Sequence, residues 1–144
     1  MACVEGWRIA WIASSAPQVA VLVDTSVMVD HLRGVDEARR ALQSASHEGE
    51  RLVATVMCKV EVLAGMRLHE ETATRALLSV FDWLPVSEAV AEHAGMLANR
   101  YLRSHPGVDP VDYVVAATAE RAGAELWTLN VKHFPMFPGL RPPY

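Results

Sequence analysis

The stretch Val19-Ala20-Val21-Leu22-Val23-Asp24-Thr25-Ser26 decides the fold. Its first five residues are all apolar, as in a strand buried on both faces of a parallel sheet. The polar residues that follow end the strand and begin a helix in one step. Ligands of open parallel sheets bind outside the carboxyl ends of the strands, so Asp24 lies where a functional carboxylate is expected. The competing interpretation is a helix cap, and one carboxylate can do both.

Outward from this stretch, short apolar runs alternate with segments of helical periodicity. This alternation is typical of an α/β fold, so we expect a central, mostly parallel sheet flanked by helices. The expected strands are residues 19–23, 52–55, 83–86 and 125–129. The expected helices are residues 27–32, 36–47, 56–64, 70–81, 90–102 and 110–122, with Asp36 as an N-cap and Ala73, Leu77, Leu78 and Phe81 on one buried stripe. The proline-rich tail is expected to be irregular.

The composition suits one compact domain. The chain has 144 residues, of which 51% are hydrophobic and 21% charged, and this is enough apolar material for a single core. We assign residues 19–144 to that domain and residues 1–18 to an N-terminal extension. The net charge of −4 excludes a protein that binds nucleic acid through overall basicity, but not an enzyme that binds a cation through carboxylates.

Three features of the sequence bear on the cellular compartment. Cys3 and Cys58 form no CxxC pair and suit a reducing cytoplasm better than a disulfide scaffold. No run approaches the roughly 20 apolar residues that span a membrane. The first 20 residues lack the basic start and clean apolar run of a signal peptide, so we interpret them as an extension or a mis-assigned start. We therefore expect a cytoplasmic protein that does not bind membranes.

Three more acids accompany Asp24. Glu61 sits in an apolar helix whose narrow polar side it shares with Cys58 and Lys59, although a solvated helix face is the simpler interpretation. Asp112 lies in the first turn of a helix that is apolar nearly all round, where a negative charge gains from the helix dipole. Asp109 is three residues earlier and needs no explanation beyond capping that helix.

The last strand ends at Asn130, whose amide suits a hydrogen bond or a water-mediated metal contact, or merely a turn. If the sheet is parallel, these polar residues meet at one edge. Crowded carboxylates repel each other, and a divalent cation relieves the repulsion. Hard oxygen ligands favour Mg²⁺ or Mn²⁺ over Zn²⁺. Such an ion lowers the pKa of a bound water and stabilises charge on a phosphate.

These residues form a pattern of four motifs. The first is residues 21–27, the second is Thr55 with Glu61 and Gly65, and the third is residues 112–119. The fourth is residues 126–130 followed by His133-Phe134. Each motif alone is weak evidence for a family, but the four in this order and spacing resemble the motifs of the PIN-domain family. The compact chain is similar in size to the VapC branch of that family, the toxins of VapBC toxin–antitoxin pairs.

The resemblance implies a PIN-like fold and an Mg²⁺- or Mn²⁺-dependent endoribonuclease that cuts RNA such as tRNA, rRNA or mRNA. It implies inhibition by a small VapB-type antitoxin, for which the helix at 70–81 and the first two helices would form an apolar groove, and it makes a homodimer plausible. The residues carried over as catalytic metal ligands are Asp24, Glu61 and Asp112. The fourth acidic position of many members falls at Asn130, which weakens a second metal site unless Asp109 compensates.

The expected reaction is metal-assisted phosphodiester hydrolysis. Thr25 or Ser26 is expected to donate a hydrogen bond to a carboxylate or to the scissile phosphate, and no histidine is needed as a base. Arg33 and Arg67 are among the cations available for RNA, with Arg39, Arg40 and Lys132 favoured.

Two other classes compete. A catalytically degenerate PIN-fold RNA-binding protein is supported by Asn130 but opposed by the three retained acids. A phosphoaspartate domain is opposed by Ser26, which stands where a haloacid-dehalogenase-type phosphatase has its second aspartate, and by the missing acidic pair of a receiver domain.

Overall fold

A four-stranded parallel sheet forms the centre of the molecule. The computed structural model describes residues 19–144, and the predicted extension at residues 1–18 lies outside the described part. The strand order is β3-β2-β1-β4, so the first strand is an inner one, as its apolar sequence predicts. All three neighbouring pairs are parallel. The strands are β1 (Ala20–Val23), β2 (Arg51–Thr55), β3 (Asp82–Leu84) and β4 (Glu125–Trp127).

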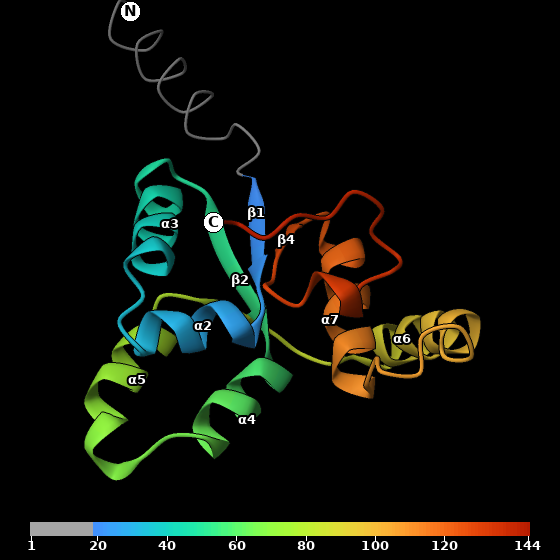
Figure 1. Ribbon diagram of the computed structural model, residues 1–144, viewed down its shortest axis with the longest axis horizontal. Coiled ribbons are helices and arrows are strands. Elements are labelled where there is room, and N and C mark those ends of the chain that lie inside the picture. The colour runs from blue at the N-terminus through green and yellow to red at the C-terminus, as the bar shows by residue number, and fades with distance from the viewer. Residues whose placement is uncertain (1–18) are drawn as a thin grey trace, which may run out of the picture.

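Helices cover both faces of this sheet, with α3 on one side and α7 on the other (Figure 1). The pair α6–α7 makes the most extensive contact between any two elements of residues 19–144. The α-helices are α2 (Thr25–Leu32), α3 (Asp36–His47), α4 (Val56–Ala64), α5 (Glu71–Leu78), α6 (Glu88–Tyr101) and α7 (Pro110–Ala122). Two short 3₁₀ helices are η1 (Leu68–Glu70) and η2 (Val131–His133). The predicted α/β class and flanked parallel sheet are confirmed.

The core lies between the sheet and its helices. Val21, Leu22 and Val23 of β1 are wholly buried. α7 is buried from Asp112 to Ala119 except at the half-buried Val114, because this helix packs between the sheet and α6. The irregular tail is not a loose appendage, since Phe134 is 1% exposed within the same core. No helix of residues 19–144 has the length and apolar character needed to span a bilayer.

Several local predictions shift by a few residues. Asp36 is the first residue of α3 and not its cap, because the preceding Val35 takes the extended capping conformation. The helix predicted at 70–81 begins as η1 and ends at Leu78. Its inward stripe contains Thr74 in place of the exposed Ala73, because Thr74 lies three and four residues before Leu77 and Leu78 and so shares their face of the α-helix.

The strand predicted at 83–86 occupies Asp82–Leu84, and the one at 125–129 ends at Trp127. Both are short because they lie at the two edges of the sheet, where one side of the strand has no partner. The predicted closure of α7 at Gly123 is confirmed, with the glycine in the left-handed region at φ 60°.

Candidate active site

The predicted site residues surround one cavity at the carboxyl edge of the sheet. Its volume is about 320 Å³. The end of β1, the start of α2, the middle of α4, the start of α7 and the segment after β4 all reach it. The lining residues are Asp24, Thr25, Ser26, Val29, Asp30, Arg33, Glu61, Asp109, Asp112, Leu129, Asn130 and His133. Every residue named from the sequence as a metal ligand or accessory group is therefore brought to this cavity.

Asp24 is the most deeply held carboxylate. It is 5% exposed, and its Oδ2 accepts hydrogen bonds from Thr128 at 2.8 Å and from Ser26 at 3.3 Å. The Cys58 thiol lies 4.0 Å from Oδ1. Asp24 precedes α2 but makes no side-chain capping bond, so the capping interpretation is wrong for its carboxylate. Burial raises the pKa of Asp24, and the hydrogen bond from Thr128 opposes the rise.

Glu61 is the solvent-facing carboxylate of the set. Its Oε1 accepts a hydrogen bond of 2.9 Å from Thr25. Partial burial raises the pKa of Glu61, the Thr25 bond opposes the rise, and the charges of Asp24 and Asp109 add to it. The expected hydrogen bonds from Thr25 and Ser26 to carboxylates are thus both present.

Asp109 and Asp112 form a capping box at the first turn of α7. Asp109 Oδ1 accepts from the Asp112 amide at 3.1 Å, and Asp112 Oδ2 accepts from the Asp109 amide at 3.2 Å. The predicted capping role of Asp109 is confirmed, although its side chain also faces the cavity. Burial raises the pKa of Asp112 to about 6, with the charge of Asp109 contributing and His133 opposing. His133 Nδ1 lies 3.1 Å from Asp112 Oδ2.

The donors suit a hard divalent cation. They are carboxylate, hydroxyl and amide oxygens, with Cys58 buried behind Asp24 and its thiol pKa raised to about 12 by burial and the Asp24 charge. Burial is the main cause of the raised carboxyl pKa values, and at Glu61 and Asp112 the charges of neighbouring carboxylates add to it. A bound cation would favour the charged carboxylates again. Among residues 19–144, however, no three His, Cys, Asp or Glu side chains lie close enough together to enclose an ion as they stand.

Sequence reasoning missed three contributors. Cys58 was assigned to the polar side of α4 but is fully buried, because that helix turns it toward Asp24. His133 was noticed only as part of a motif, although it touches Asp112. Arg33 reaches the cavity, whereas the favoured Arg39, Arg40 and Lys132 do not line it. Thr128 falls inside the strand expected at 125–129, whereas it lies after β4 and donates to Asp24.

Comparison with known proteins finds relatives that match most of the chain. The PIN domain family model matches residues 21–134. The chain is 47% identical to "Ribonuclease VapC19" of Mycobacterium tuberculosis over 123 residues, which are 85% of this chain and 98% of that protein. It is 44% identical to "Ribonuclease VapC10" of the same organism over 124 residues, 86% of this chain and 92% of that protein.

Solved structures give the same fold. A toxin–antitoxin complex from Klebsiella pneumoniae contains a chain with a TM-score of 0.70 and 29% identity, covering 86% of this chain and 98% of that one. DNA-bound VapBC from Salmonella typhimurium matches with a TM-score of 0.72 over 87% of this chain and 97% of that one. Its 19% identity supports likeness of fold alone.

Proposed function

The chain belongs to the PIN-domain family, and we propose that it is a VapC-type ribonuclease toxin that hydrolyses RNA phosphodiester bonds with a bound Mg²⁺ or Mn²⁺ ion. The observation that carries this proposal is the convergence of Asp24, Glu61 and Asp112 on one cavity. The named relatives support ribonuclease activity, and the oxygen donors support the metal. Binding of RNA without cleavage would not require three carboxylates whose charges repel each other.

In this proposal Asp24, Asp112 and Glu61 hold the ion, with Asp109 and Asn130 as accessory groups. When bound, the ion would lower the pKa of a water molecule and offset the charge of the phosphate. Thr128 and Ser26 fix the orientation of Asp24, and Thr25 fixes Glu61.

The exposed Glu61 is placed to orient the attacking water. Its Oε1 is engaged by Thr25, and no residue of the described chain donates a hydrogen bond to Oε2. That second oxygen can therefore accept a hydrogen bond from a water molecule in the cavity. His133 is engaged with Asp112, so the scheme uses no histidine as a general base.

The proposed partners rest on the same similarity to VapC proteins. A VapB-type antitoxin as partner is supported by the toxin–antitoxin complex from Klebsiella pneumoniae, in which the matching chain is 29% identical. The apolar groove expected for it, between the helix predicted at 70–81 and the first two helices, remains a prediction. We further propose a cytoplasmic homodimer, for which the exposed Val60 and Met96 offer apolar surface. A single-subunit mass by light scattering would contradict the dimer.

The deciding experiment is cleavage of total RNA by purified, antitoxin-free protein with and without Mg²⁺ or Mn²⁺. We expect metal-dependent fragments that disappear in Asp24→Asn. Asp36→Asn is the matched control, because Asp36 is an exposed acid that pairs with Arg39 outside the cavity. Cleavage should survive in that control.

The alternative remains a catalytically degenerate PIN-fold protein that binds RNA. It is favoured by Asn130, which brings an amide to the cavity at the fourth acidic position of many relatives. Absence of cleavage by folded, metal-loaded protein across several RNA pools, together with retained RNA binding, would establish this alternative and reject the enzyme.

A further inference from the structure

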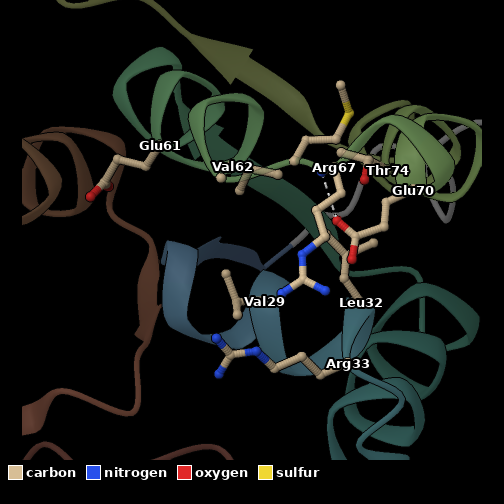
Figure 2. A pocket seen from close by; sticks show the side chains of 10 residues that line it. Val29, Leu32, Arg33, Glu61, Val62, Arg67, Glu70 and Thr74 are labelled. Atoms are coloured by element: carbon tan, nitrogen blue, oxygen red, sulfur yellow. Dashed lines mark hydrogen bonds between the residues drawn. The ribbon is translucent and has the colours of Figure 1, made fainter.

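The cavity beside the active site contains two arginines from different elements. Arg33 follows α2, and Arg67 lies in the loop after α4. Figure 2 shows Arg67 extending from that loop toward α2, while Arg33 extends along α2 into the same space near Val29. Two guanidinium groups in one cavity repel each other unless an anion lies between them.

This cavity shares lining residues with the active-site cavity. Val29, Arg33 and Glu61 line both cavities. Glu61 lies at one end of the view in Figure 2, away from Arg67. An RNA strand that occupies the cavity lined by Arg33 and Arg67 would therefore pass these two arginines before it reaches the site carboxylates.

The two carboxylates that line this cavity, Glu61 and Glu70, accept their hydrogen bonds from groups other than the arginine side chains. Glu70 accepts a hydrogen bond of 2.9 Å from the backbone amide of Arg67, and Glu61 accepts one from Thr25. Asp30, three residues before Arg33, accepts a hydrogen bond of 3.0 Å from Tyr144. Within residues 19–144 neither Arg33 nor Arg67 forms a salt bridge.

Among residues 19–144, other exposed cations such as Arg121 also lack a salt bridge, but only Arg33 and Arg67 line this cavity. Arg39, Arg51 and Arg75 each pair with a neighbouring carboxylate. An RNA substrate must approach a cavity lined by several carboxylates, so it needs positive charge close to the entrance. Arginine suits this task because its planar guanidinium can donate two parallel hydrogen bonds to one phosphate.

We propose that Arg33 and Arg67 form a phosphate-binding subsite that holds the backbone of the RNA strand next to the scissile bond. The ligand is a phosphodiester of single-stranded RNA, and recognition is by charge and geometry, without regard to base. This inference rests on the proposed ribonuclease function and assigns the direction from which the substrate enters.

The test uses Arg33→Gln, Arg67→Gln and the double variant. Arg121→Gln is the matched control, because Arg121 is exposed near the far end of α7 from Asp112 and gives the same change in charge. Binding of a fluorescent single-stranded RNA is measured in EDTA over a salt series. Cleavage of the same RNA is measured with Mn²⁺.

We expect the double variant to lower the salt dependence of binding, log Kobs against log salt, by about 1.4, at about 0.7 per phosphate contact. KM should rise about tenfold or more, with kcat changed less than about threefold, because the contacted phosphates are not the reacting one. Arg33→Lys and Arg67→Lys should keep the salt dependence, since they keep the charge, while losing part of the affinity.

An unchanged salt slope and KM in the double variant, beside a parent that cleaves normally, would overturn this inference and leave the ribonuclease function intact. The same variant with intact RNA cleavage but weakened binding of the cognate antitoxin would also overturn it, and would assign the arginines to the protein partner. A parent that neither binds nor cleaves RNA would reject the function and the inference together.

Discussion

Val21, Leu22 and Val23 lie in the interior of β1, fully buried among apolar side chains, whereas the next residue, Asp24, is buried among hydroxyl groups and other carboxylates. Burial of the first three stabilises the fold through the hydrophobic effect. Burial of Asp24 raises its pKa and disfavours the charge that metal binding requires. Residues that stabilise the fold and a residue of the candidate site are therefore neighbours in the chain. Substitutions in the apolar core should lower stability and spare activity, whereas substitutions of the site carboxylates should lower activity and spare stability.

The sharpest test of that separation is Asp112→Asn. We expect the rate of RNA cleavage to fall about 10³-fold, roughly 4 kcal/mol, because a charged metal ligand is lost. The melting temperature at pH 7 should be equal or higher, since the amide carries no charge to repel Asp109. Activity and thermal unfolding are measured on the same preparation. A variant that is both inactive and strongly destabilised would show that Asp112 has a structural role.

The opposite signature is expected from Leu22→Ala. Leu22 is fully buried in the middle of β1, so truncation should lower the free energy of unfolding by about 3 kcal/mol through lost burial and a residual cavity. Cleavage per folded molecule, measured well below the melting temperature, should stay within about twofold of the parent. Loss of activity in a fully folded Leu22→Ala protein would mean that core packing and site geometry are coupled.

Metal binding at the site carboxylates should raise the melting temperature of the protein independently of the packing of the apolar core. At a concentration of Mn²⁺ or Mg²⁺ about 100 times its Kd, stabilisation is about 2.7 kcal/mol. Thermal unfolding is followed in EDTA and across a metal titration. The shift should persist in Leu22→Ala and shrink in Asp24→Asn. An equal shift in Asp24→Asn would place the ion elsewhere.

A smaller effect is expected from Thr128→Val, which removes the 2.8 Å hydrogen bond to Asp24 with little change in shape. A hydrogen bond to a charged group contributes about 2 kcal/mol, so cleavage should fall roughly 30-fold. Thr118→Val is the control, because the buried Thr118 hydroxyl donates to the Val114 carbonyl within α7 and not to a site carboxylate. Equal losses in both variants would indicate a packing defect.

The smallest effect concerns pH. The pKa of Asp112 is raised to about 6, so the folded, metal-free protein binds that proton more tightly than the unfolded chain. The contribution of Asp112 to the free energy of unfolding therefore falls as pH rises from about 4 through about 6. The pKa values of Asp24 and Glu61 are raised as well, so these groups act in the same direction. The stability advantage of Asp112→Asn over the parent in EDTA should grow by about 1 kcal/mol across this range. A constant difference would contradict the raised pKa.

Much of the fold followed from local pattern. The apolar run of β1, Pro110 at the start of α7 and Gly123 at its end are confirmed, because each depends on interactions within a few residues. The buried stripe predicted for the helix at 70–81 is confirmed at Leu77, Leu78 and Phe81 but wrong at Ala73, since regular helical spacing puts Thr74 on that face. The tertiary packing covers this face of the helix although one of its residues is polar.

The sequence by itself determined which residues would meet at the carboxyl edge. Parallel strands all end at one edge, so acids that follow strands or begin adjacent helices must converge there. This reasoning placed Asp24, Glu61 and Asp112 in one cavity before any distance was known.

Only the tertiary structure decided how those acids are held. The donor to Asp24 is Thr128, 104 residues away, and Glu61 is bound by Thr25 from a different helix. Arg33 and Arg67 likewise enter one cavity from separate elements. The physical reason is that a local pattern fixes which face of an element is buried, whereas distances between side chains of different elements depend on how the helices pack against the sheet.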